Sequence, residues 1–516
     1  MLALVGVWRV VASLAMLGAL TEAAVPADEV QGAELPGYAR PFPHQTHYSG
    51  YVTTVYPGRS GVVVHTHYYL VVHEDPATPL VQWQQGGPGG SSLIGMLTEM
   101  GPLTLNDASF GGDDPSTPRV FDHVAGWQNV TGGASLLFLE HPAPTGFSYC
   151  EPADACDHTD ESQAALHLAV LEAFFSDEMY PELAARRYVM SGESYAGVLV
   201  PTVALAILEK RAALDAAARR RAPYSLEGFA LGNDCPGNRV FTCTPYSGWA
   251  GTQVSLDFLH GHGMISDAKK RDIDAACAGW YEVAPPGPQS PPPPRCAAAL
   301  EDPIRPAKSF AGDTYDMGGG YFLYDACASD LRVRSDGGEA RERPPLRPTA
   351  DAVRTAARLL DGDAYANDAG EYACGQENAA AAWLNAPSVQ AALHVKPQTF
   401  HFSTGLAYNF TRYSLLDAYN ATLVKQFRIM QYSGDADPCV PHVGTQRWIA
   451  SLAMPVDRDW RPYTAPGTMA VTGYVTTYLG GDFTFATVRD AGHMAPRYKP
   501  RELLYLFDQW LQKKPI

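Results

Sequence analysis

The amino-acid sequence predicts an α/β protein whose central sheet is mostly parallel and is covered by helices on both faces. Short β-rich runs fill residues 48–84, and the uniformly apolar run 136–139 is typical of a strand buried on both sides. Amphipathic helices are expected over residues 161–175 and from Gly197 onward. Strands that alternate with helices in this way favour a parallel sheet between two helical layers.

The alternation is interrupted once and then resumes. Strands are expected at residues 226–231, 427–432 and 483–488, and a closing helix at 501–511. Residues 233–348 instead contain five cysteines, a proline-rich run at 285–294 and a charged stretch at 332–347. The proline run predicts an extended surface loop, because proline suits neither a helix interior nor a central strand. We therefore expect a signal peptide (1–24), a first core part (35–232), a disulfide-containing cap insertion with the Pro-rich loop (233–348) and a second core part (349–516).

Composition and charge exclude several classes of protein. The 516 residues are 46% hydrophobic and 18% charged, which is ordinary for a folded chain. The 38 basic and 55 acidic residues give a net charge of −17. Such a charge disfavours binding to nucleic acid and to anionic membrane surfaces.

Three features indicate the secretory pathway. Residues 10–20 are apolar and follow Arg9, and they are too few to span a bilayer but suit the core of a signal peptide. Most of the nine cysteines are expected to pair in an oxidising compartment, with at least one left over. Glycosylation sequons begin at Asn129, Asn409 and Asn420. The expected location is the extracellular space or a vacuolar or lysosomal lumen, without a membrane anchor after signal cleavage.

The most informative motif is Gly192–Ala196, closed by Gly197. It follows a strand-like run at 187–190 and precedes the apolar run 198–203. A serine flanked at two positions on either side by small residues, between a strand and a helix, is typical of a nucleophile elbow. Ser194 would then be exposed at the positive end of the following helix. One such motif can occur by chance, so it needs partners.

The partners follow in the order that α/β-hydrolases use, which is serine, acid, histidine. Asp435 and Asp437 stand in a turn after the strand expected at 427–432, and His493 stands in a loop after the strand expected at 483–488. The glycine-rich run 85–90 also follows a strand. Glycines allow backbone N–H groups to approach a developing oxyanion closely. Together these segments predict nucleophilic catalysis by serine.

With these motifs the chain resembles a serine carboxypeptidase of the α/β-hydrolase fold. The resemblance covers most of residues 48–232 and 378–511 and is poor in the insertion. It is carried by segments 49–52, 83–92, 137–149, 191–197 and 384–395, together with the aspartate and histidine segments. It implies an exopeptidase that releases C-terminal residues from peptides or proteins through an acyl-enzyme, with no cofactor and no metal.

The resemblance also implies a role for individual residues. The nucleophile, its orienting acid and the base would be Ser194, Asp437 and His493. The oxyanion hole would be the N–H groups of Gly87 and Tyr195. The substrate's terminal carboxylate would be bound by Gln85, Gly86, Glu99 and Glu193. Since two glutamates and the substrate carboxylate cannot all be ionised at close range, binding is expected to be favoured at acidic pH.

This sequence departs from the family's pattern at three positions. Gln85 replaces an asparagine, which adds a methylene where an amide should reach the substrate. Gly90 replaces a common cysteine, so one long-range disulfide is expected to be absent. Pro144 stands where a glycine is common. None of the three is a residue of the expected triad.

Several alternatives stay open at this point. An acyltransferase that passes the acyl group to an alcohol is one, and a non-catalytic protein that binds or protects a partner is another. Alternating histidines at 65–67 and 260–262 more often mark one face of a structural element than a metal site. Cys439 is expected to be either an unpaired thiol or bridged to the insertion. The oligomeric state is undetermined, and a homodimer is compatible with the chain.

Overall fold

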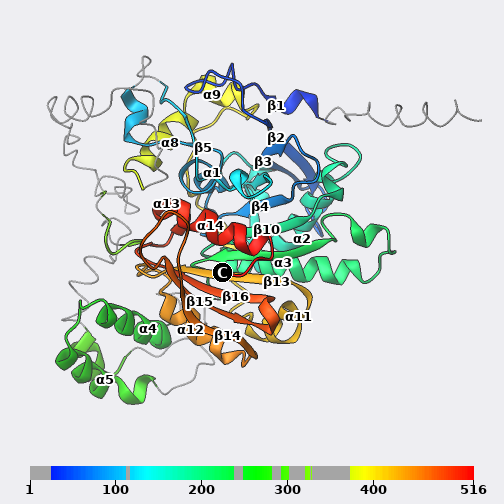
Figure 1. Cartoon of the computed structure of the whole chain (residues 1–516). Helices are drawn as coiled ribbons and strands as arrows, with labels where there is room; N and C mark the ends of the chain where they lie inside the picture. The colour runs from blue at the N-terminus through cyan, green and yellow to red at the C-terminus, as the bar shows by residue number, and fades with distance from the viewer. Residues whose placement is uncertain are drawn as a thin grey trace, which may run out of the picture.

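A computed structural model describes residues 25–111, 117–237, 248–281, 292–300, 320–325, 327 and 372–516 of the chain (Figure 1). The expected signal peptide, the charged stretch and the beginning of the proline run lie outside the described residues. The last residue of that run, Pro294, opens a helical segment. The expectation that the whole run avoids helix is therefore wrong at this position, because proline is compatible with the first turn of a helix.

A mixed sheet of twelve strands runs through the described part of the chain, in the order β1-β2-β3-β7-β4-β10-β11-β13-β16-β15-β14, with β8 beside β3. The central strands from β7 to β16 are parallel, and the strands at both ends are antiparallel. The strands are β1 (Glu29–Val30), β2 (Gln45–Val55), β3 (Val63–His73), β4 (Leu80–Gln84), β7 (Ser135–Leu139), β8 (Tyr149–Glu151), β10 (Tyr188–Glu193), β11 (Leu226–Gly232), β13 (Arg428–Gly434), β14 (Val456–Tyr463), β15 (Gly473–Tyr478) and β16 (Phe483–Val488).

Helices cover both faces of this sheet, and each face has its own hydrophobic core. One core contains α2 (Asp160–Phe174), α3 (Ala196–Arg211), α12 (His442–Ser451) and the stretch formed by α10 (Leu416–Ala418), a π-helical turn (Tyr419–Leu423) and α11 (Val424–Gln426). The other contains α1 (Ser92–Thr98), α8 (Gln376–Leu384), α9 (Pro387–Ala392), α13 (Ala495–Tyr498) and α14 (Pro500–Leu511). The predicted fold class, a helix-covered sheet with a parallel centre, is confirmed.

The central strands are buried because they lie between two helical layers. Every residue of β4, β7 and β16 is buried. Among the described helices, α1 and α2 begin at a side-chain cap. In α2 the Thr159 side chain accepts a hydrogen bond from the N–H of Ser162, and the Ser162 side chain accepts one from the N–H of Thr159. The α2 and β16 predictions agree with the structure to within one residue at each end.

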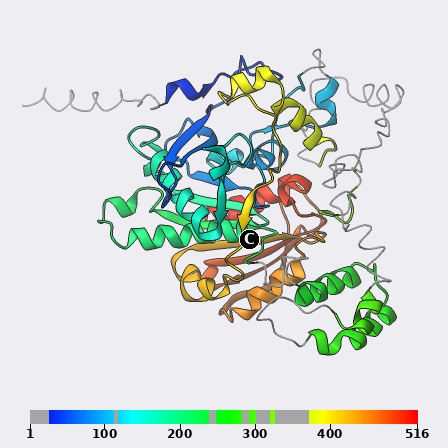
Figure 2. The ribbon, with the colours of Figure 1, turned by 180° about the vertical axis from the view of Figure 1, so that it is seen from behind.

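Two small sheets and the helices α4 and α5 lie outside the layers described so far. β5 (Leu103–Thr104) pairs with β6 (Phe121–Asp122), and β9 (Asp157–Thr159) pairs with β12 (Ala407–Asn409). Helices α4 (Gly248–Gly261) and α5 (Asp267–Tyr281), drawn in green, stand at one corner of the molecule beside α12 (Figures 1 and 2). Both helices fall within the predicted cap insertion, whose boundaries stay a prediction.

The described disulfides are Cys150–Cys156, Cys277–Cys296 and Cys327–Cys374. Cys235 is also in a disulfide. Cys439 is in none of the disulfides between described residues. The predicted disulfides of the insertion are thus present, and one of them, Cys327–Cys374, reaches from the insertion to the start of the second core part.

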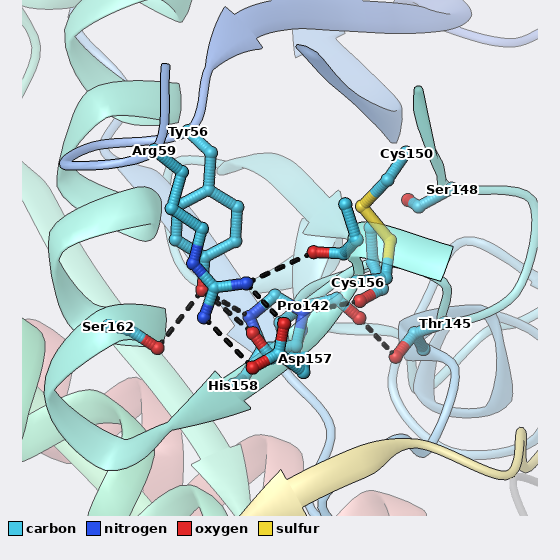
Figure 3. Close-up of a disulfide and its surroundings, with 12 residues drawn as sticks. Tyr56, Arg59, Pro142, Thr145, Ser148, Cys150, Cys156, Asp157, His158 and Ser162 are labelled. Carbon is cyan, nitrogen blue, oxygen red and sulfur yellow. Dashed lines mark hydrogen bonds and ion pairs between the residues drawn. A yellow bond between two sulfur atoms is a disulfide. The ribbon is translucent and has the colours of Figure 1, made fainter. Parts of the chain in front are cut away.

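The Cys150–Cys156 disulfide lies where the turn between β2 and β3 meets the start of α2 (Figure 3). The Arg59 guanidinium lies over the Tyr56 ring, 4.3 Å from its centre, and pairs with the Asp157 carboxylate. The Tyr56 hydroxyl contacts His158 Nδ1 at 2.8 Å. These contacts fix the beginning of α2, where Asp160 Oδ1 accepts a hydrogen bond from the Tyr195 hydroxyl at 2.7 Å.

Replacing both Cys150 and Cys156 with alanine should lower the free energy of unfolding by about 2 kcal/mol, since a short disulfide loop restricts the unfolded chain modestly. The two cysteines are separated by only 6 positions. Urea unfolding monitored by tryptophan fluorescence measures the change. A variant as stable as the natural chain would contradict this account.

Candidate active site

Four neighbouring parallel strands bring the candidate residues to one edge of the sheet. β10, β11, β13 and β16 are adjacent and point in the same direction. Ser194 follows β10, Asn233 follows β11, Asp437 follows β13 and His493 follows β16. The carboxyl ends of parallel strands are the usual place for a site in an open α/β sheet.

Ser194 occupies a sharp turn between β10 and α3. Its φ of +61° is in the left-handed region, which a residue with a side chain rarely adopts. The turn is held by hydrogen bonds from the Ser194 N–H to the Gly232 carbonyl (3.0 Å) and from the Cys235 N–H to the Ser194 carbonyl (3.1 Å). A Cβ atom on Gly192 would lie 2.7 Å from the Ala196 Cβ, so the small residues are required by space.

His493 and Asp437 form a buried pair. His493 Nδ1 lies 2.7 Å from Asp437 Oδ2. The Asp437 carboxylate also accepts hydrogen bonds from the N–H groups of Cys439 (2.7 Å) and Val440 (3.1 Å). A carboxylate only accepts, so the histidine must carry its proton on Nδ1 and leave Nε2 available to accept another.

The sequence offered two candidates, Asp435 and Asp437, for the acid that orients His493, and their contacts in the structure distinguish them. Asp435 Oδ1 accepts the N–H of Asp490 at 2.7 Å and lines a separate cavity of about 580 Å³ together with Arg489. Asp437 alone of the two contacts His493. The tertiary structure therefore supports the assignment that the resemblance implied.

Asn233 is a candidate site residue that the sequence analysis missed. Its Nδ2 donates to Asp437 Oδ2 at 2.8 Å, and its Oδ1 accepts the N–H of Gly434 at 2.9 Å. Its φ of +39° is also in the left-handed region. A polar residue two positions after the strand predicted at 226–231 was the signal, because that strand lies between the two that carry the serine and the acid.

The glycine-rich loop after β4 lies directly against the elbow. A Cβ atom on Gly86 would be 2.6 Å from the backbone nitrogen of Tyr195 and 2.7 Å from the Ser194 Cβ. Gly87 has a φ of +113°, which favours glycine. Gly87 and Tyr195, the expected oxyanion-hole residues, thus belong to two backbone segments in contact beside Ser194.

The loop is held without the disulfide that Gly90 precludes. Gly90 forms an isolated antiparallel bridge with Ser403, and the Ser91 N–H donates to the Phe402 carbonyl at 2.9 Å. The Ser91 hydroxyl donates to the buried carboxylate of Glu140. Backbone contacts therefore connect the loop to the second half of the chain, and a side-chain hydrogen bond connects it to Glu140 in the first half.

His67, one of the histidines considered for metal binding, belongs to the hydrogen-bond network that holds the glycine-rich loop in place. Its Nδ1 lies 2.9 Å from Glu140 Oε2 and its Nε2 lies 3.0 Å from the Ser49 hydroxyl, all fully buried. Within the described ranges, no group of three or more His, Cys, Asp or Glu side chains could hold a metal ion.

The residues expected to bind the substrate carboxylate form a buried cluster next to the nucleophile. Gln85 Nε2 lies 2.6 Å from Glu193 Oε1 and 3.5 Å from Glu99 Oε1, while Gln85 Oε1 accepts the Trp83 indole N–H at 2.8 Å. Both glutamates are 1% exposed. Their Oε2 atoms have no hydrogen-bond partner among the described residues.

Burial governs the protonation of this pair. It raises the pKa of Glu99 to about 7. Burial, followed by the charge of Glu99, raises the pKa of Glu193 well above its usual range. At least one of the two carboxyl groups is therefore protonated below neutral pH and can donate a hydrogen bond.

The three predicted glycosylation sites, Asn129, Asn409 and Asn420, are all exposed. The Asn129 side-chain amide donates to the backbone carbonyls of His123 and Val124. Exposure is compatible with the expected glycans, which stay a prediction.

Comparison with known proteins agrees with this geometry. The family model described as serine carboxypeptidase matches residues 36–513. The chain belongs to the serine carboxypeptidase family. Serine carboxypeptidase 1 of Hordeum vulgare is 29% identical, over 93% of this chain and 93% of the relative. Serine carboxypeptidase-like 21 of Arabidopsis thaliana is 28% identical, over 93% of this chain and 94% of the relative.

A solved structure shares the fold. Kex1Δp, a prohormone-processing carboxypeptidase from Saccharomyces cerevisiae, superposes with a TM-score of 0.66 at 18% identity, covering 94% of this chain and 96% of that one. Together with the sheet order, this neighbour identifies the α/β-hydrolase fold. In the parts of the chain that the structure describes, no helix combines the length and the apolar character that crossing a bilayer requires.

The buried pair predicts a specific dependence of stability on pH. Carboxyl groups in an unfolded chain have a pKa of about 4.3, so the folded state binds more protons from there up to about pH 7. The contribution of Glu99 to the free energy of unfolding is complete below that window and is lost as pH rises through it, and the contribution of Glu193, whose pKa is raised as well, declines over the same range. Glu193→Gln removes one ionisable group. The stability of this variant relative to the natural chain should therefore rise by about 1 kcal/mol or more from pH 5 to pH 8.

Urea unfolding at pH 5, 6, 7 and 8 measures this change, with Glu209→Gln on the exposed part of α3 as the matched control. Equal pH dependence in the two variants would show that the Glu99–Glu193 pair does not retain a proton in the folded state.

Proposed function

We propose that the chain is a serine-type carboxypeptidase that releases C-terminal residues from peptides through an acyl-enzyme. The observation that carries the proposal is the buried Glu99–Glu193 pair, in which Glu193 directly precedes the nucleophile and both carboxyl groups contact the Gln85 amide. A buried carboxyl group that keeps its proton can donate a hydrogen bond to a substrate carboxylate, which an ionised carboxylate cannot do. The family membership supports the same reaction class.

In the proposed reaction the Ser194 hydroxyl attacks the last peptide bond and His493 Nε2 accepts its proton. Asp437 holds the imidazole by Nδ1 and stabilises the cation that forms. The N–H groups of Gly87 and Tyr195 would stabilise the oxyanion. The described structure has no hydrogen bond to the Ser194 hydroxyl, and catalytic bonds of this kind often form only with substrate bound.

The same cluster explains why an exopeptidase is preferred over an endopeptidase. A free C-terminal carboxylate can accept hydrogen bonds from a protonated glutamate and from the Gln85 amide. An internal peptide bond places no carboxylate there and leaves buried polar groups without partners, which is costly. Gly86 belongs to this cluster as the point where the loop approaches Ser194.

The proposal includes the secretory pathway and an extracellular, vacuolar or lysosomal location. The disulfides among the described residues support an oxidising compartment, and the exposed sequons are accessible for glycosylation. The substrates would be the C-termini of peptides or proteins. A homodimer is compatible with the proposal.

Ser194→Ala should abolish peptide hydrolysis while preserving the fold, since alanine fits the elbow. The expected loss in kcat is on the order of 10⁶. Mass spectrometry of a peptide panel with free and amidated C-termini measures the release of terminal residues. Residual activity above a few per cent, or rapid cleavage of internal bonds, would overturn the assignment.

The carboxyl pair predicts a rise in KM with pH. As pH passes about 7, Glu99 loses its proton and gains a negative charge that repels the substrate carboxylate, so a free-acid peptide should bind more weakly. The matching peptide amide should lose much less affinity, because it carries no terminal charge. KM measured from pH 4.5 to 8 for both peptides tests this, and parallel curves would exclude Glu99 and Glu193 as the carboxylate site.

A second function, acyl transfer, is favoured by Gln85. Its amide already contacts both glutamates and Trp83 inside the protein, so it is less free to serve a peptide carboxylate. An acyl-glucose donor with an alcohol acceptor, assayed beside the peptides, separates the two reactions. A protein that used neither substrate, and whose Ser194 did not react with a fluorophosphonate, would be a non-catalytic relative.

A further inference from the structure

The predicted cap insertion returns to the candidate active site at residues 320–325. The ring of Tyr321 lies over the imidazole of His493, with ring centres 4.9 Å apart and planes inclined by 29°. The His493 N–H donates to the Tyr321 carbonyl at 2.6 Å. One residue of the insertion thus contacts both the backbone and the side chain of the expected base.

The same segment also contacts the loop that carries the acid. The Leu323 N–H donates to the carbonyl of Ala436 at 3.0 Å, directly before Asp437. Tyr321 packs closely against the loop that carries His493. A Cβ atom on Gly492 would lie only 2.3 Å from the Tyr321 carbonyl oxygen, so no side chain fits at that position. Residues 320–325 therefore contact the acid loop and the base loop together.

Independent contacts anchor this segment away from the two loops. The Phe322 ring packs against Tyr498 of α13, with ring centres 4.5 Å apart. The Tyr372 hydroxyl donates to Asp325 Oδ1 at 3.0 Å, and the Cys327–Cys374 disulfide lies beside that bond. The position of Tyr321 is therefore not merely a consequence of its contact with His493.

We propose that Tyr321 is a positioning residue for the catalytic base. The single hydrogen bond from Nδ1 to Asp437 fixes one point of the imidazole but leaves rotation about that bond, whereas a ring against its face restricts this rotation. The orientation of Nε2 matters twice, first to accept the serine proton and then to protonate the leaving amine. This inference rests on the proposed function.

The test compares two substrates that share one acyl group, a peptide and an activated nitrophenyl ester. The amine leaving group needs a proton from the imidazolium, whereas nitrophenolate leaves without one. In Tyr321→Leu, kcat/KM per active site should fall about 10-fold or more for the peptide and clearly less for the ester. The peptide KM should change less than about twofold, because the cluster around Gln85 is unaltered.

Matched variants complete the design. Tyr321→Phe keeps the ring and should retain activity within about threefold. Tyr324→Leu alters an exposed tyrosine of the same segment and should behave like the natural chain. Titration with a fluorophosphonate counts active sites, so molecules that fail to fold do not enter the comparison. Tyr321→Met, which is apolar but not flat, replaces the leucine variant if that variant does not fold.

Equal losses for peptide and ester, or a Phe variant as impaired as the Leu variant, would overturn the positioning role. A natural chain that cleaves neither substrate would instead contradict the proposed function itself, so the two failures are distinguishable.

Discussion

The arrangement of the site depends on one buried carboxylate. Asp437 accepts hydrogen bonds from His493, from Asn233 and from two backbone N–H groups of its own loop. A buried charge without such partners would cost several kcal/mol, so the loops after β11, β13 and β16 must meet at this point. The same convergence positions Ser194, because its N–H binds the Gly232 carbonyl directly before Asn233.

A second consequence of burial is chemical. Glu99 at the end of α1 and Glu193 at the end of β10 share a space from which water is excluded, so burial and mutual repulsion keep a proton on the pair. The carboxylate of Asp437 is instead supplied with donors. Carboxyl groups therefore differ in role within one site. The Glu99–Glu193 pair can donate a hydrogen bond because it keeps a proton, whereas Asp437 accepts hydrogen bonds because donors surround it.

Much of this could be predicted from local sequence. The strand around residue 485 and the helix of residues 160–174 are evident because apolar periodicity reflects burial directly. The elbow is evident because space around Ser194 admits only small neighbours. Asn233 and Tyr321 were not predicted. The position of Asn233 after a predicted strand is only a weak local signal, and a tyrosine in an irregular insertion has none, since the partners of both residues lie far away in the chain.

The sequence by itself determined the fold class, the order of the serine, acid and histidine, and the family resemblance, because each depends on short-range patterns of size, polarity and spacing. Only the tertiary structure decided that Asp437 rather than Asp435 contacts His493, and that Glu99 and Glu193 are buried together. It also placed the insertion's Tyr321 on the imidazole. These are contacts between distant segments, which depend on how the strands are ordered in the sheet rather than on any local pattern.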